Sequence, residues 1–289
     1  MVDTPKVAVI TGASSGIGKQ AAKELAAQGW RIIGVGRDEG RCAAAEQEVR
    51  SVAAGADVTM LRADMSLLKA CERLAEDIAG LTDRIHVLLN NAGGMASEKV
   101  MTAEGFEQNF ASNHLGPFVL TNRLLPLLEK AAADAEPGTV RIINTSSDAS
   151  EMIPSLNLSD MQNLGNWSVG AAYCSGKLAN VLHAKALARR LASKGIVAHS
   201  FHPGMVDSNF FSHASEQTQA QYEGAPKRTV EEGADTAVWL ATSPDGACAS
   251  GTYWYERAPR DPHALARDDA FVDQFWDASI KLTETAPSS

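Results

Sequence analysis

Short, nearly continuous apolar runs alternate along the chain with longer segments in which apolar residues recur at helical spacing. Runs without polar alternation are typical of strands that are buried on both faces of a parallel sheet. We therefore predict seven strands, at residues 7–11, 31–36, 57–63, 86–93, 139–147, 196–204 and 251–256. The segments between them predict helices at about 17–28, 40–53, 67–79, 104–131, 171–193 and 230–242, and a final helix is expected at about 268–282.

Capping signals support several of these helix boundaries. Gly29 stands where a helix that ends just before it would place a left-handed terminal glycine. Ser66 precedes the third helix as a candidate N-cap. Thr229 and Glu232 have the spacing of a capping box.

The regular alternation of strands and helices predicts an α/β fold, a Rossmann-type doubly wound parallel sheet of about seven strands with helices on both faces. We expect one domain over residues 1–289, with a core at about 5–256 and a C-terminal extension at 257–289. Two segments, 148–170 and 205–228, lack clear periodicity and are too long for plain connections. Both follow strands, and ligands of open α/β sheets bind beyond the carboxyl ends of the strands. We expect an apolar pocket there, with a wall that includes Met205, Phe210, Phe211 and Tyr222.

Composition and charge exclude several classes of function. Hydrophobic residues make up 45% and charged residues 21% of the 289 residues, which suits a globular protein with a sizeable core. The formal net charge of −9 argues against nucleic acid or an anionic membrane surface as a partner.

The four cysteines are far apart and include no C-x-x-C pair, which favours a reduced compartment and argues against a metal site. Too few residues precede the first apolar run for a signal peptide, and no apolar run approaches the ~20 residues that a membrane helix needs. We predict a cytoplasmic protein with no membrane anchor.

The stretch TGASSGIG, at residues 11–18, follows the first strand and opens the first helix. Its glycines allow a tight turn and a close approach to a pyrophosphate, at which the helix N-terminus is aimed. We predict that this turn binds a dinucleotide through Gly12, Ser14, Ser15, Gly16, Ile17 and Gly18.

The end of the second strand, VGRD, discriminates between the two nicotinamide cofactors. Gly36 occupies the position where a carboxylate would bind the ribose of NAD, and Arg37 follows it. An arginine there accommodates the 2′-phosphate of NADP, so we predict NADP(H) as the cofactor, with NAD(H) as the less favoured one. Asp38 leaves the alternative open, because it would reach the ribose if the strand ran one residue longer.

Two further strand ends lie at the same predicted edge. Asp64, just after the third strand, either contacts the adenine or is an ordinary loop aspartate. The small-residue turn NNAG ends the fourth strand and lets the backbone pass close to a ligand through Asn91, Ala92 and Gly93. Asn90 either belongs to this turn or ties strands together.

Tyr173 and Lys177 lie four residues apart at the start of a predicted helix and therefore share one face. Reduction of a carbonyl by hydride transfer builds negative charge on oxygen, which needs a proton donor nearby. A phenol has a pKa near ~10, and a cation one helical turn away favours its ionised form and lowers that pKa. Ser147, at the end of the fifth strand, could orient the substrate oxygen by a hydrogen bond.

These motifs, together with Asn113, NTSS at the fifth strand end and HPG after the sixth, occur in the order and spacing of the short-chain dehydrogenases/reductases. The chain resembles this family over roughly residues 5–255, and the run at 171–191 resembles its retinol-dehydrogenase-like branch. The resemblance implies that Ser147, rather than Ser146, is the catalytic serine. It also implies that Asn113 holds a water in a proton relay.

The resemblance assigns further contacts to the cofactor. Lys177 is expected to bind the nicotinamide ribose, with Tyr173 beside it, and the turn through Pro203, Gly204 and Val206 is expected to fold over the carboxamide. Ser208 stands where the family often has threonine. Copies of such proteins often pair through the helices at 104–131 and 171–193, which predicts a homodimer or homotetramer.

We therefore expect an NADP(H)-dependent oxidoreductase that interconverts an alcohol and its ketone or aldehyde on a small, apolar or aromatic substrate. One alternative is a nucleotide-binding regulator that has lost turnover. Another is a relative that acts on C=C bonds or works as an epimerase or dehydratase. His199, His202 and His213 are expected to be structural.

Overall fold

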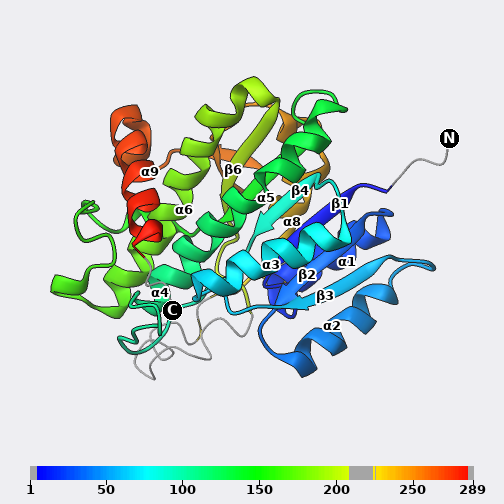
Figure 1. The fold of residues 1–289 in the computed structure, drawn as a ribbon, viewed down its shortest axis with the longest axis horizontal. Helices are drawn as coiled ribbons and strands as arrows, with labels where there is room; N and C mark the ends of the chain where they lie inside the picture. The colour runs from blue at the N-terminus through cyan, green and yellow to red at the C-terminus, as the bar shows by residue number, and fades with distance from the viewer. Residues whose placement is uncertain (1–4, 208–223, 225, 286–289) are drawn as a thin grey trace.

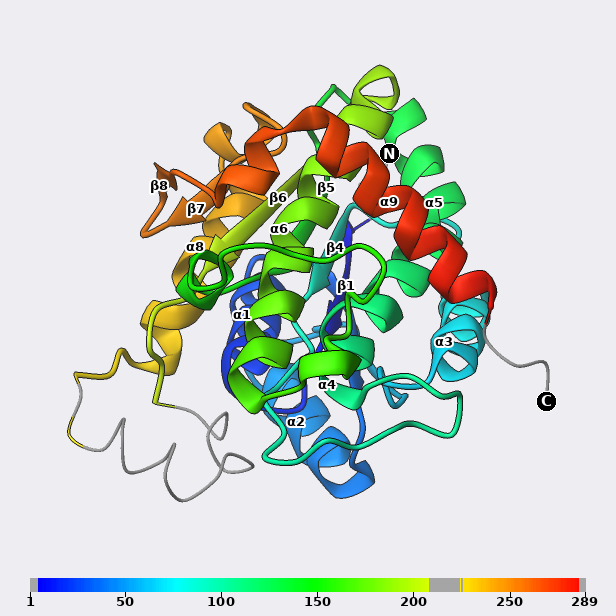
Figure 2. The same ribbon diagram turned by 90° about the vertical axis from the view of Figure 1, so that its left-hand side faces the viewer.

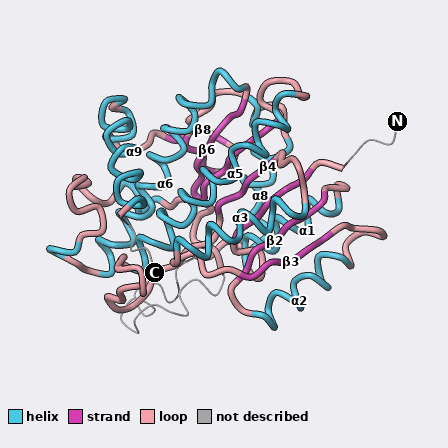
Figure 3. The backbone as a smooth tube through the Cα atoms, viewed as in Figure 1, coloured by secondary structure: helices cyan, strands magenta, loops and turns pink. Residues whose placement is uncertain are grey.

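The structure is a computed structural model that describes residues 5–207, 224 and 226–285. Its centre is an eight-stranded sheet in the order β3-β2-β1-β4-β5-β6-β7-β8, drawn in magenta in Figure 3. Strands β1 to β7 are parallel and β8 is antiparallel to β7. The bounds are β1 Val7–Thr11, β2 Arg31–Gly36, β3 Val58–Arg62, β4 Val87–Asn90, β5 Val140–Thr145, β6 Ile196–His202, β7 Tyr253–Tyr255 and β8 Ala258–Arg260.

Helices cover both faces of this sheet, which confirms the predicted doubly wound fold (Figure 1). One face carries α1, α2 and α8, and the other carries α3, α5 and α6. The bounds are α1 Gly16–Ala27, α2 Glu39–Arg50, α3 Leu68–Leu81, α4 Gln108–Phe110, α5 Gly116–Ala133, α6 Val169–Leu191, α8 Val230–Thr242 and α9 Asp269–Glu284. A π-helical segment, Ala111–Leu115, joins α4 to α5.

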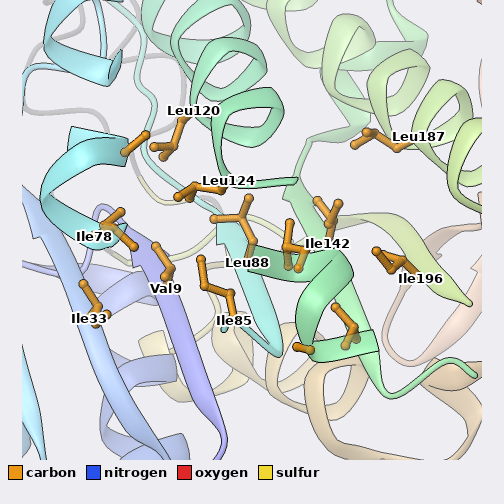
Figure 4. Close-up of a cluster of buried hydrophobic side chains, with 14 of the residues drawn as sticks. Val9, Ile33, Ile78, Ile85, Leu88, Leu120, Leu124, Ile142, Leu187 and Ile196 are labelled. Carbon is orange, nitrogen blue, oxygen red and sulfur yellow. The ribbon is translucent and has the colours of Figure 1, made fainter. Parts of the chain in front are cut away.

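Alternate residues of the central strands point to opposite faces of the sheet and pack into two separate apolar cores. Val9 of β1 packs with Leu88 and Leu124 on the α5 side, as Figure 4 shows, whereas Ile10 belongs to the core on the α1 side. All five residues of β1 are buried, so a strand in this position has to be apolar on both faces. This is the physical reason for the unbroken apolar runs in the sequence.

The strand order reverses between β1 and β4, where helices leave to opposite faces of the sheet. A crevice forms at such a point beyond the carboxyl ends of the strands, and ligands of open α/β sheets bind there. The segments that follow β1, β2, β4, β5 and β6 all begin at this edge.

The edge strand β8 is absent from the sequence prediction. It forms a hairpin with β7 across Glu256 and Arg257, whose φ angles are 49° and 60°. Such a turn normally uses Asn or Gly, because other residues are strained at positive φ. An ion pair between Arg257 and Asp235 of α8 holds the turn in place, and nothing in the local sequence signals it.

The predicted cap of the third helix is wrong, whereas two other capping predictions are confirmed. Ser66 bonds to Asp64, and the first amides of α3 are bound by the carboxylate of Glu104, which accepts from Leu68 N at 2.6 Å and Lys69 N at 3.0 Å. Gly29 has φ +82° just after α1, and Thr229 and Glu232 form a capping box at the start of α8.

The C-terminal helix α9 lies across α5 and α6, as Figure 2 shows. Its Trp276 packs on Phe118 of α5 with ring centroids 4.8 Å apart. The guanidinium of Arg190 on α6 lies 4.5 Å from the centre of the Trp276 ring and binds Asp273 at 3.0 Å. In the part of the chain that the structure describes, no helix combines the length and apolar character needed to cross a bilayer.

A buried polar network ties β4, β5, α5 and α6 together. The side-chain amide of Asn90 donates to Thr121 Oγ1 and Asn144 Oδ1, both at 3.0 Å. The amide of Asn144 in turn donates to the carbonyl of Asn180 at 3.1 Å. Asn90 is only 4% exposed, so its role is the structural one of the two that the sequence allows.

Replacing Asn90 by alanine tests this network. The change leaves Asn144 Oδ1 and Thr121 Oγ1 buried without their donor, so we expect the free energy of unfolding to fall by about 2–3 kcal/mol. Urea denaturation followed by circular dichroism measures this loss. The exposed Asn157→Ala variant is the control. Equal stabilities of the two variants would contradict a stabilising role of the Asn90 side chain.

Candidate active site

The glycine-rich turn after β1 lies against the end of β4. A Cβ atom on Gly12 would come within 2.8 Å of Asn91 Nδ2, and one on Gly18 within 2.5 Å of the same atom. Gly12 and Gly16 also have positive φ angles, +71° and +52°. Glycine is favoured at position 12 by both the close approach and the backbone conformation, at position 18 by the close approach and at position 16 by the backbone conformation.

Thr11 joins the two segments and was missed by sequence reasoning. Its Oγ1 accepts from the backbone amides of Asn91 and Ala92, both at 2.9 Å, and Asn91 Nδ2 donates to the carbonyl of Thr11 at 3.0 Å. These two amides are therefore committed to the protein itself. The only signal for Thr11 in the sequence is its place directly before Gly12.

The first turn of α1 suits a dinucleotide pyrophosphate. Ser15 occupies the N-cap position in extended conformation, and its side chain makes no capping hydrogen bond. Free amides at a helix N-terminus attract anions. The side chains of Ile17 and Val206 both lie against α8, because a Cβ on Gly233 would come within 3.3 Å of Ile17 and 2.5 Å of Val206.

The end of β2 is followed by an arginine at the edge of the sheet. Arg37 is exposed, and its side chain makes no hydrogen bond or ion pair with a described residue. Asp38 instead caps α2, with Oδ1 accepting from Arg41 N at 2.8 Å. One oxygen of the Asp38 carboxylate is thus engaged in its own helix, and its use as a ribose ligand stays the alternative prediction.

Asp64 has a local structural role at the end of β3. Its Oδ1 accepts from both the amide and the hydroxyl of Ser66, at 2.9 and 2.7 Å. The side chain remains partly exposed, so an adenine contact stays a prediction.

Asn113 lies in the π-helical segment, where one extra residue per turn widens the helix. Its amide nitrogen donates to the carbonyls of Gly94 and Asn109, both at 2.8 Å, while its Oδ1 is buried without a described partner. A Cβ on Gly93 would lie 2.4 Å from that oxygen and 3.5 Å from Lys177 Nζ. Gly93, Asn113 and Lys177 therefore converge, although their positions in the sequence are far apart.

Lys177 is a buried cation on α6. It is 4% exposed, and its ammonium donates to the carbonyl of Thr145 at 3.3 Å. Burial lowers the pKa of Lys177 from 10.5 to about 8. The Nζ atom lies 5.6 Å from the centre of the Tyr173 ring, so the predicted pairing of the two side chains on one helical face is realised.

The two serines after β5 have different environments. Ser146 is 2% exposed and its hydroxyl donates to the carbonyl of Lys177 at 2.7 Å, which fastens α6 to the sheet. Ser147 is half-buried, and its hydroxyl donates to Asp148 Oδ1 at 2.9 Å and accepts from Ala149 N at 3.2 Å. Of the two hydroxyls, only that of Ser147 has exposed surface around it.

Asp148 and His202 form a second ionisable pair near Ser147. His202 Nε2 lies 3.8 Å from Asp148 Oδ2, while Nδ1 accepts from the Asp148 amide at 3.3 Å. Burial lowers the pKa of His202, which keeps the imidazole neutral with its proton on Nε2. Its ring stacks on Tyr255 at 5.0 Å, in agreement with a structural role.

The turn after β6 completes the edge. Gly204 has φ +83°, and Val206 forms a parallel bridge with Arg228, so the turn that begins at Pro203 is anchored in front of α8. Ser208, Phe210, Phe211, His213 and Tyr222, which the sequence analysis named, lie outside the described residues. Within residues 5–207, 224 and 226–285, no group of His, Cys, Asp and Glu could hold a metal ion.

Comparisons with known proteins find similar chains. A family model described as short chain dehydrogenase matches residues 6–219. Human retinol dehydrogenase 12 is 35% identical over 96% of this chain and 86% of its own length, and mouse polyprenol dehydrogenase is 32% identical over 96% and 84%.

Solved structures show the same fold. An uncharacterized protein from Mycobacterium Paratuberculosis superposes with a TM-score of 0.75 at 29% identity, covering 99% of this chain and 98% of that one. A Pseudomonas aeruginosa protein solved as an RhlG/NADP active-site complex superposes with a TM-score of 0.68 at 27% identity, covering 86% and 93%.

Replacing Lys177 by methionine tests the cost of the buried cation in the cofactor-free protein. Because the folded-state pKa of Lys177 lies below its unfolded value, the folded state bears the full cost below about pH 8 and sheds it as the pH rises toward 10.5. We expect Lys177→Met to raise the free energy of unfolding at pH 7 by about 2 kcal/mol, after loss of the hydrogen bond to Thr145.

Urea denaturation at a series of pH values measures this difference, which should shrink between pH 8 and 10.5. The exposed Lys194→Met variant is the control and should show no such trend. A wild-type protein that is more stable than Lys177→Met at pH 7 would show that burial is not costly at this position.

Proposed function

Since the chain belongs to the short-chain dehydrogenase family and is an NAD(P)-dependent oxidoreductase of alcohol and carbonyl groups, we propose that it interconverts an alcohol and its ketone or aldehyde with NADP(H). The observation that carries this proposal is the convergence of Gly93, Asn113 and Lys177 beside the Tyr173 ring. This cluster lies at the carboxyl edge of the sheet, where the glycine-rich turn is also placed.

The bound nicotinamide supplies or accepts the hydride, and the protein handles the proton. Tyr173 donates a proton to the developing alkoxide, and the Lys177 ammonium stabilises the phenolate that remains. Ser147 binds the substrate oxygen once its hydroxyl turns away from Asp148. The unpartnered Asn113 Oδ1 is an acceptor suited to a water that returns a proton through Lys177.

Two observations support NADP(H) over NAD(H). Arg37 has no described anionic partner at the place where a 2′-phosphate would lie, and the nearby carboxylate of Asp38 is engaged as a helix cap. The Pseudomonas aeruginosa neighbour was solved with NADP. Arg37 would bind the phosphate with its planar guanidinium.

An apolar or aromatic substrate is proposed from the exposed side chains of the segments that follow two strands of the carboxyl edge. Among the residues that the structure describes, the large exposed apolar side chains are Val100, Met101, Met152 and Leu164. They lie in the segments that follow β4 and β5, and Lys99 joins these segments by donating to the carbonyl of Leu164 at 3.1 Å. The names of the retinol and polyprenol dehydrogenases among the relatives point to the same class.

If two copies of the chain pair, we propose that they do so through a surface that α9 leaves uncovered. The sequence analysis placed a dimer contact on the helices now seen as α5 and α6, and α9 takes up part of that surface through Phe275 and Trp276. A homodimer or homotetramer would use the remaining surface of these helices or another face.

Replacing Tyr173 by phenylalanine tests the acid. We expect the rate constant kcat for every accepted carbonyl to fall by at least about 10²-fold, because no group replaces the phenol proton. NADPH absorbance over a panel of aliphatic and aromatic aldehydes and ketones measures the rate, and fluorescence titration should show unchanged NADPH binding. Cys174→Ala is the neighbouring control, and wild-type turnover by Tyr173→Phe would refute the assignment.

Replacing Arg37 by alanine tests the cofactor preference. We expect NADPH affinity to fall by about tenfold and NADH affinity to stay within twofold, because only NADPH carries the phosphate that the guanidinium binds. Fluorescence titration of the substrate-free protein measures both dissociation constants. Arg73→Ala, on α3, controls for the loss of one positive charge, and equal affinities of the wild-type protein for NADPH and NADH would reject the preference.

A further inference from the structure

We propose that Arg62, at the end of β3, is a second ligand of the cofactor 2′-phosphate, and that Glu39 competes with the phosphate for its guanidinium. This inference rests on the proposed use of NADP(H). It adds to Arg37 a specificity-determining residue from another strand and a carboxylate that opposes it.

The strand register places Arg62 beside the end of β2. Gly36 and Arg62 are paired neighbours in the parallel β2–β3 ladder. Paired residues of adjacent strands carry their side chains on the same face of the sheet. A Cβ on Gly36 would point at Cys42 Sγ, 2.5 Å away, and at the Ser14 side chain, 2.8 Å away, so this is the face of α1 and α2. Arg62 therefore lies on the face where the glycine-rich turn lies.

The same crowding excludes the usual ribose carboxylate. Any side chain at position 36 would collide with Cys42 of α2 or with Ser14 of the turn, so aspartate or glutamate cannot stand there without a shift. The hydroxyl of Ser14 donates to no described residue and lies next to this point. Ser14 and Arg62 thus share this face of the sheet, and Arg37 directly follows position 36, where a carboxylate would otherwise accept from the ribose.

The charges around this point are only partly balanced. Arg41 lies 3.7 Å from the Asp38 carboxylate, which also caps α2. Arg62 binds Glu39 at 2.9 Å, and this is the one hydrogen bond that its side chain makes with described residues. The side chains of Arg62 and Glu39 are 57% and 79% exposed. An exposed pair of this kind contributes little to stability, so it can be broken at small cost.

A phosphate monoester is a stronger partner for Arg62 than Glu39 is. It carries close to two negative charges at neutral pH and offers three acceptor oxygens to a planar guanidinium. The Glu39 carboxylate, by contrast, repels the phosphate and also binds the guanidinium of Arg62 that the phosphate would bind. Removing Glu39 should therefore strengthen NADPH binding, and removing Arg62 should weaken it.

A double-mutant cycle tests this arrangement on the full chain without substrate. The variants are Arg62→Gln, Glu39→Gln and the two combined, and fluorescence titration gives the dissociation constants for NADPH and NADH. We expect Arg62→Gln to weaken NADPH by about tenfold. We expect Glu39→Gln to tighten NADPH about threefold in the wild-type background and to have a smaller effect when Arg62 is absent. NADH should stay within twofold throughout.

Competition with adenosine 2′,5′-bisphosphate and with adenosine 5′-monophosphate isolates the phosphate, because the two probes differ in the 2′-phosphate. Arg62→Gln should weaken only the bisphosphate. Arg73→Gln, on α3 at the opposite face of the sheet, removes the same charge and should change neither. An equal loss of NADPH affinity in Arg73→Gln would show a general charge effect and overturn the inference.

The two proposals fail in different ways. A wild-type protein that binds NADPH no better than NADH would refute the proposed cofactor. A wild-type preference for NADPH that Arg62→Gln leaves intact would refute the role of Arg62 and leave the cofactor standing. An effect of Glu39→Gln that is equal with and without Arg62 would refute the competition between them.

Discussion

A buried ammonium group is the constraint around which the rest of this site is arranged. Lys177 gives up its hydration and keeps a long hydrogen bond to the carbonyl of Thr145. Burial without a carboxylate is costly, and a chain selected only for stability would place an apolar residue there. The arrangement is useful because a desolvated cation acts strongly on a neighbouring phenol, and any nearby carboxylate would weaken that action.

Much of the surrounding polar structure keeps this cation in place. Asn180 donates to the same Thr145 carbonyl at 3.0 Å, and Ser146 binds the backbone of Lys177 itself. The π-helical segment carries Asn113 toward Lys177, which a regular α-helix of the same sequence would present at a different angle. The network from Asn90 to Asn144 then fixes α5 and α6 to the two central strands that support both groups.

The sequence predicts the regular elements well because strands buried on both faces appear as unbroken apolar runs and amphipathic helices as apolar residues at helical spacing. It also predicts the approach of Tyr173 to Lys177, since helical spacing alone fixes that contact. It fails where the partner is distant along the chain. Glu104 caps α3 from beyond the next strand, and Asp235 of α8 supports the strained hairpin of β8. Thr11 was missed for the same reason, because its partners follow a different strand.

Substitutions at the two ends of the site, the catalytic end and the nucleotide end, would differ in their effect on the stability of the fold. Of the groups proposed to handle the proton, Asn113 and Lys177 are buried and bonded to the surrounding backbone, so substitutions there would affect the fold as well as the chemistry. The groups proposed to choose the nucleotide, Arg37, Arg62 and Glu39, are exposed and make few other contacts. Cofactor preference is therefore free to change with little effect on stability, provided that glycine is kept at position 36. A return to a ribose-binding carboxylate at that position would require Cys42 and Ser14 to move first, because both occupy the space that its side chain needs.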